Sequence, residues 1–97
     1  MNIDTIINDS IQFMVNNHKT TLKSKHIQST IETLYPVQFP TTNLIGTYLL
    51  NKFTETKGPA GKPVTYKLIE NQIRNHPSFV GHGFKLSKCT IVYLCSV

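Results

Sequence analysis

The sequence predicts a small α+β domain with three to four helices followed by a C-terminal β-hairpin. Three observations support this fold class. Apolar residues recur at helical spacing in several stretches, one segment is rich in glycine and proline, and the last nine residues are rich in β-branched and aromatic side chains. Of the 97 residues, 39% are hydrophobic and 15% are charged, which suffices for one folded core. We therefore expect residues 1–97 to form a single domain.

Stripes of isoleucine predict the first two helices. In residues 3–16 the apolar side chains recur three and four positions apart, at Ile3, Ile6, Ile7, Ile11 and Met14. Residues 24–35 begin with Ser24, which is a suitable helix cap. The apolar stripe of this second helix comprises Ile27, Ile31, Leu34 and Tyr35. We expect residues 1–20 to supply an additional N-terminal helix and residues 24–97 to form the main part of the domain.

A third helix is predicted for residues 41–53, with Thr41 or Thr42 as its cap. Residues 37–39 precede it between two prolines and should be extended or form a turn, because proline disfavours helix in the residue before it. Gly46 weakens the helix by up to about 1 kcal/mol and is expected to mark a close helix crossing. The apolar side of the helix comprises Leu44, Ile45, Tyr48, Leu49 and Phe53.

The stretch TETKGPAGKPVTYKL, residues 54–68, admits two interpretations. Apolar residues alternate from Val64 to Leu68, as in the second strand of a hairpin with a basic tip. Tyr66, Ile69 and Ile73 also lie at helical spacing, as in a helix over residues 65–76 that follows a loop. We favour the helix, because the hairpin would leave the apolar C-terminal strand without a partner. If residues 64–68 were a strand, the binding face would move to residues 41–53.

The C-terminal segments GFKLS and CTIVYLCSV predict two strands. Ser87 and Lys88 between them allow a tight connection, so that residues 83–96 would form a hairpin.

This order of elements resembles the winged helix-turn-helix superfamily, from about Ser24 to the C-terminus. Locally, NQIRNHPSFVGHGFKLSK resembles the forkhead pattern at the end of the recognition helix and the start of the wing, although the chain lacks tryptophan and has a long loop. TKGPAGKPVTYKL resembles the terminal hairpin of linker-histone globular domains. TTLKSKHIQSTIETLYP is similar to the last core helix of histone H2B and its approach. The winged-helix resemblance implies that helix 65–76 lies in the major groove of DNA and that the hairpin over residues 83–96 is the wing.

The net positive charge lies in the second half of the chain. Lysines and acids cancel in residues 1–50, and residues 51–97 carry the whole net charge of +5. Such an asymmetry suggests a polyanionic partner. The face of helix 65–76 opposite its apolar stripe carries amide and basic side chains that can bond base edges, whereas lysines of the loop and wing suit phosphates. The candidate DNA-binding residues are Lys57, Lys62, Lys67, Asn71, Gln72, Arg74, Asn75, Lys85 and Lys88.

These features predict a regulatory or architectural protein that binds duplex DNA. The alternative is a protein-protein interaction module, or a subunit of a larger assembly, on the same fold. The apolar stripe of residues 3–16 is a candidate surface for a homodimer. The sequence contains no catalytic motif and no tight metal-ligand spacing, so we expect no enzymatic activity, metal or cofactor. It contains neither a long apolar run nor a signal peptide, which predicts an intracellular protein without a membrane partner. Its abundance of Asn, Ile, Lys and Thr is typical of an AT-rich genome, such as that of a virus or a protist.

Overall fold

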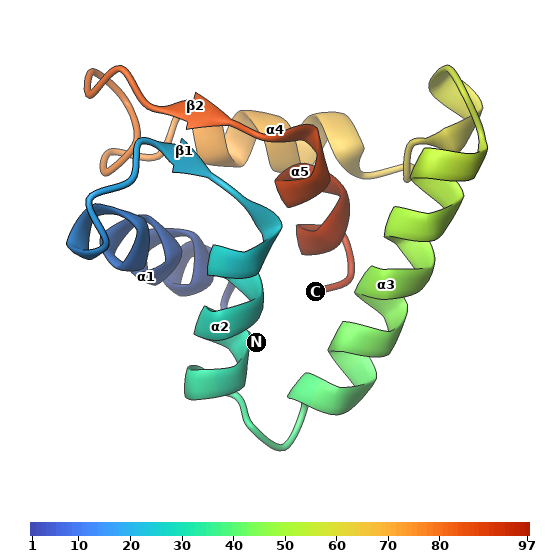
Figure 1. Ribbon diagram of the computed structural model, residues 1–97, viewed down its shortest axis with the longest axis horizontal. Coiled ribbons are helices and arrows are strands. Elements are labelled where there is room, and N and C mark those ends of the chain that lie inside the picture. Colours follow the sequence, from blue (N-terminus) through green and yellow to red (C-terminus); the bar gives the residue numbers. More distant parts are fainter.

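The computed structural model describes all 97 residues and contains five α-helices and a two-stranded parallel sheet. The fold is therefore mostly helical with a small β component. The elements in chain order are α1 (Ile3–Asn16), β1 (Thr21–Leu22), α2 (Ser24–Leu34), α3 (Phe39–Glu55), the short 3-10 helix η1 (Pro59–Gly61), α4 (Tyr66–Arg74), β2 (Lys85–Leu86) and α5 (Lys88–Leu94). In Figure 1, α5 lies between α2 and α3, and it contacts both of these helices as well as α4.

Helix α1 begins where predicted because Asn2 caps it: the Asn2 side-chain oxygen accepts a hydrogen bond of 3.2 Å from the Thr5 N–H. Its apolar stripe is almost completely buried, with exposed fractions of 0 to 1% for Ile6, Ile7, Ile11 and Met14. The helix packs mainly on α2 and belongs to the same hydrophobic core as the rest of the chain. The stripe predicted for a homodimer is thus covered by the chain itself.

Helix α3 is longer than predicted and begins at Phe39, with Pro40 in its first turn. Proline is well accommodated there because the first N–H groups of a helix have no intrahelical partner. Neither Thr41 nor Thr42 is its cap. The predicted close crossing at Gly46 is confirmed, since a side chain at this position would lie 2.6 Å from the Tyr93 ring of α5. Part of the predicted apolar side instead faces outward: Leu44 is 75% exposed and Tyr48 is 64% exposed.

The helix favoured for residues 65–76 is confirmed as α4, and the strand interpretation of residues 64–68 is wrong. Its three predicted apolar residues, Tyr66, Ile69 and Ile73, are all buried. The preceding loop contains η1 and returns the chain from the end of α3 to the start of α4.

The predicted C-terminal hairpin is wrong, because residues 88–94 form helix α5. Ser87 caps this helix by accepting a hydrogen bond of 3.2 Å from the Cys89 N–H. All residues from Thr90 to Leu94 are buried, so the helix has no polar face. A short helix buried on every side shows the same unbroken apolar run as a buried strand, which is why the sequence pattern is ambiguous.

Strand β2 pairs with β1 in parallel, with Thr21 opposite Lys85 and Leu22 opposite Leu86. Residues 83–96 therefore form no wing. Lys85 and Lys88, predicted on that wing, lie on β2 and at the first residue of α5. The Thr90 hydroxyl donates a buried hydrogen bond of 2.7 Å to the Leu22 carbonyl oxygen, which ties α5 to β1.

None of the helices combines the length and the apolar character that crossing a bilayer requires.

Ser10 provides a test of the core packing. Its hydroxyl is fully buried in α1 and has no hydrogen-bond partner. A buried polar group without a partner loses its hydration without compensation, so we expect Ser10→Ala to raise the free energy of unfolding by about 0.5–1 kcal/mol. Urea denaturation measures this change. A decrease in stability would show that the hydroxyl has a partner in solution.

Candidate nucleic-acid interface

The basic side chains predicted on α4 are partly neutralised by one acidic residue. Glu70 Oε1 lies 3.3 Å from Lys67 Nζ, and Glu70 Oε2 lies 3.1 Å from Arg74 Nε. The hydrogen bond from Arg74 is the main cause that lowers the pKa of the Glu70 carboxyl. Arg74 Nε is therefore engaged within the helix, and α4 presents less free positive charge than predicted.

The amide side chains predicted on α4 are exposed, but two of them lie near a carboxylate. Gln72 and Asn75 line a hollow that also includes Asp4 of α1. Asp4 Oδ1 lies 3.1 Å from His76 Nε2. Asn71 is exposed outside this hollow. A carboxylate beside Gln72 and Asn75 disfavours the approach of a polyanion at the C-terminal end of α4.

Three of the predicted lysines meet around one hollow of about 340 Å³, which we call the loop hollow. Lys57 and Lys62 flank η1, and Lys88 begins α5. The other lining residues are Phe53, Thr56, Gly58 and Pro59. Lys85 is exposed on β2 and lines none of the hollows described here.

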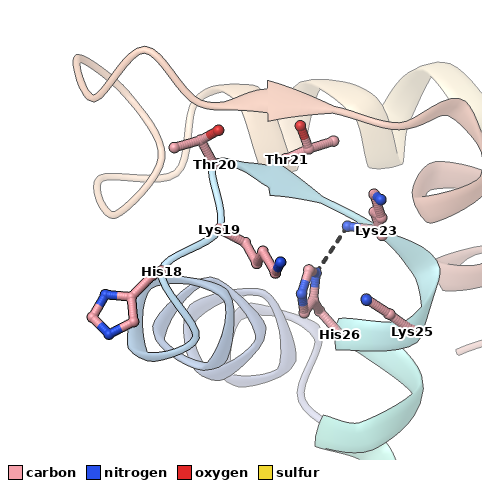
Figure 2. A pocket seen from close by; sticks show the side chains of 7 residues that line it. All are labelled: His18, Lys19, Thr20, Thr21, Lys23, Lys25 and His26. Carbon is pink, nitrogen blue, oxygen red and sulfur yellow. Dashed lines mark hydrogen bonds between the residues drawn. The ribbon is translucent and has the colours of Figure 1, made fainter.

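A second basic hollow, absent from the sequence prediction, lies where α1, β1 and α2 meet; we call it the junction hollow. Its volume is about 210 Å³, and none of its lining residues is hydrophobic. These residues are His18, Lys19, Thr20, Thr21, Lys23, Lys25 and His26. Figure 2 shows Lys19 and Lys25 extending toward His26, whereas His18 points away from it.

The backbone around His18 and Lys23 shapes the junction hollow. His18 follows α1 and has a φ of 56°, the only positive φ of a non-glycine residue in the chain, which turns the chain toward β1. β1 then leads directly into α2, whose first residue is Ser24. The N-terminal end of α2, with its partial positive charge, thus adjoins Lys23 and Lys25.

His26 forms the buried floor of the junction hollow and is only 1% exposed. Its Nδ1 accepts a hydrogen bond of 3.0 Å from the Lys23 N–H, drawn as a dashed line in Figure 2. This bond requires an unprotonated Nδ1, so the neutral ring carries its proton on Nε2. Nε2 has no hydrogen-bond partner in the protein. Burial, followed by the charges of Lys25, Lys23 and Lys19, lowers the pKa of His26 below 6.5. At neutral pH the floor of the hollow is therefore an uncharged N–H donor.

The lysines of the junction hollow have no acidic partner. Lys67 and Arg74 are the only lysine and arginine that form ion pairs, so Lys19, Lys23 and Lys25 are uncompensated. The acids of the first half of the chain lie elsewhere: Asp4 contacts His76, Asp9 accepts a hydrogen bond from Asn8, and Glu32 is in the last turn of α2. The hollow therefore combines ammonium, hydroxyl and imidazole donors suited to an anion.

The zero net charge of residues 1–50 as a whole masks the basic residues of the junction hollow. Lysines and acids cancel over residues 1–50, but no acid occurs between Asp9 and Glu32, and all three lysines of this half fall within that interval. A local count over residues 10–31 would have revealed the basic segment HKTTLKSKH.

The lowered pKa of His26 predicts that the folded protein loses stability on acidification. Because its pKa is lower in the folded chain than the ordinary 6.5, the unfolded state binds its proton more readily. The stability that this difference contributes is present above about pH 6.5 and is lost as the pH falls toward the lowered pKa. We expect the free energy of unfolding to fall between about pH 7.5 and 5.5, and to fall less in His26→Gln. Urea titrations at both pH values measure the free energy of unfolding of the unmodified protein and of His26→Gln. An equal decrease in both proteins would contradict the prediction.

No protein-family model, curated protein or solved structure matches the chain.

Proposed function

We propose that this protein binds duplex DNA through the phosphate backbone, in a regulatory or architectural role, with the junction hollow as its principal contact. The observation that carries the proposal is the convergence of Lys19, Lys23 and Lys25 around one hollow that contains no carboxylate and no apolar side chain.

The donors of the hollow match the chemistry of a phosphodiester. Lysine ammonium groups and threonine hydroxyls are common phosphate ligands in DNA complexes, and such contacts carry no sequence information. The Nε2–H of His26 adds a neutral donor at the base of the hollow. Binding that rests on these groups is driven largely by the release of counterions from DNA.

A polyanion fits the hollow better than a small aromatic ligand does. Pockets for drug-sized ligands are usually lined by apolar and aromatic side chains, whereas this lining has no hydrophobic residue. The net charge of +5 also favours an extended anionic partner. The residues from Thr20 to His26 fall within the stretch that is similar to histone H2B, and histones bind duplex DNA through its backbone.

In this proposal α4 has a secondary role. Asn71 is exposed and could reach a base edge, but the ion pairs of Glu70 with Lys67 and Arg74 must be rearranged before either cation contacts DNA. We therefore expect weak sequence preference and assign affinity mainly to the lysines of the hollows.

The outer side of α3 supports the alternative of a protein-interaction module. Leu44, Ile45 and Tyr48 lie at adjacent positions of this helix, and all three are exposed. Exposed apolar clusters of this kind often contact other proteins. This surface and the junction hollow share no residue, so a protein partner and DNA binding are compatible.

Fluorescence anisotropy with a labelled random-sequence duplex tests the proposal. Near physiological salt each lysine at an anionic surface contributes about 1 kcal/mol, so Lys19→Gln/Lys23→Gln/Lys25→Gln should weaken binding roughly 100-fold. Lys25→Gln can be compared with Lys52→Gln, because Lys52 is also an exposed helical lysine but lies outside both basic hollows. Absence of binding by the unmodified protein at about 50 mM salt would refute the proposed function. Equal losses of affinity in Lys25→Gln and Lys52→Gln would show that the junction hollow is not the DNA contact.

A further inference from the structure

The loop hollow gathers three lysines from separate parts of the chain. Lys57 follows α3, Lys62 follows η1, and Lys88 is the first residue of α5. None of the three forms an ion pair with a carboxylate. Like charges are brought together here by the fold, although their mutual repulsion opposes this arrangement.

Local packing holds these lysines in place. Gly61 is buried and lies so close to the Thr56 carbonyl oxygen that any side chain at this position would clash with the backbone. This close approach folds the loop back onto the end of α3. Lys62 Nζ lies 4.6 Å from the centre of the Tyr66 ring, which orients its side chain. The cap of Ser87 on α5 fixes the backbone that carries Lys88.

Most of the lysines that form no ion pair line one of the two hollows. Of the ten lysines and arginines, Lys67 and Arg74 pair with Glu70. Six of the remaining eight line either the junction hollow or the loop hollow, three in each. The two hollows have no residue in common. In Figure 1 the loop with η1 lies at the right-hand end of the long axis, and the chain between α1 and β1 lies toward the opposite end.

We propose that the loop hollow is a second binding site for duplex phosphates, separate from the junction hollow, so that one molecule holds two duplex segments. This inference rests on the proposed function, because it assigns the same ligand chemistry to a second surface. Two uncompensated lysine triads at separate places on one small molecule favour two contacts over one continuous footprint. Such a protein would cross-link DNA segments, which specifies its role as architectural.

Binding stoichiometry tests this proposal directly. A DNA hairpin with a stem of about 6 bp is about 20 Å long, shorter than the 32 Å extent of the protein. Isothermal titration calorimetry at low salt should give two hairpins per molecule for the unmodified protein. Each of the variants Lys57→Gln/Lys62→Gln/Lys88→Gln and Lys19→Gln/Lys23→Gln/Lys25→Gln should bind one. These two variants remove the same charge, so each is the matched control of the other.

The outcomes separate the two proposals. No hairpin bound by the unmodified protein refutes the proposed function itself. One hairpin bound, lost in the junction-hollow variant and retained in the loop-hollow variant, overturns the second site and leaves the proposed function standing. Circular dichroism establishes that each variant is folded, and Lys57→Arg/Lys62→Arg/Lys88→Arg should again bind two hairpins because it keeps the charge.

A free phosphate ion shares the chemistry of the duplex backbone and is distinguished by a separate titration. Inorganic phosphate added to the isotope-labelled protein should shift the backbone amide signals of Gly58 and Gly61 only weakly and without saturation. Saturation at submillimolar phosphate, together with failure of the hairpin to shift the same signals, would assign the site to a small phosphate and overturn the duplex assignment.

Discussion

Raising the salt concentration from about 50 to 200 mM is expected to weaken binding to a long duplex about a thousandfold. Each phosphate neutralised by a lysine contributes about −0.9 to the slope of log K against log salt. A long duplex can bend back to place one segment in each hollow, so that six lysines contact phosphates of the same DNA molecule and give a slope near −5. A protein that binds DNA mainly through apolar or base-edge contacts would show a much smaller slope.

The same salt titration on the two triple lysine variants shows how much of the slope each hollow contributes. Removing the three lysines of either hollow should reduce the magnitude of the slope by about 2.7, and Lys52→Gln should reduce it by less than about 1. Fluorescence anisotropy at five or so salt concentrations gives each slope. An unchanged slope in either triple variant would show that the lysines of that hollow do not contact phosphates.

The helices that pack one face against the core were predictable from the sequence, because their apolar residues recur at helical spacing along the buried face. The stripes of Ile6, Ile7 and Ile11 in α1 and of Ile69 and Ile73 in α4 identify these helices. Helix α5 was not predictable in this way, because it is enclosed on every side and its β-branched residues favour a strand locally. The cap provided by Ser87 and the packing of α5 between other helices override that preference.

The sequence predicts which types of residue form the candidate site, but not how these residues are arranged in space. The sequence indicates that Lys57, Lys62 and Lys88 suit phosphates, and the fold places them together for a reason that no local pattern contains: Lys88 begins a helix where the turn of a hairpin was predicted. The ion pairs of Glu70 on α4 follow from i,i+3 and i,i+4 spacing and could have been anticipated. The junction hollow depends on the turn at His18 and on the burial of His26, neither of which a charge count reports.

Gly46 is the position of α3 at which a single added carbon should have the largest effect. An alanine Cβ would lie 2.6 Å from Tyr93 Cε2 and 2.7 Å from Tyr93 Cδ2, well inside normal contact. The Tyr93 ring cannot easily move away, because it is 2% exposed and its hydroxyl lies 2.7 Å from Asn43 Oδ1 in a hydrogen bond. Overpacking a rigid site costs about 1–3 kcal/mol, whereas alanine gains up to about 1 kcal/mol in helix propensity over glycine. The cost of overpacking therefore exceeds the gain.

We expect Gly46→Ala to lower the free energy of unfolding by about 1–2 kcal/mol, as measured by urea denaturation. Thr47→Ala is the matched control, because Thr47 is the next residue of α3 and is exposed; it should be neutral or slightly stabilising. Tyr93→Leu removes the ring that the new methyl group meets, so the double variant should be more stable than the sum of the single effects predicts, by about 1 kcal/mol. Additive effects would mean that α3 and α5 separate freely at Gly46. Some other contact would then fix the distance between the loop after α3, which contains Lys57, and Lys88, the first residue of α5.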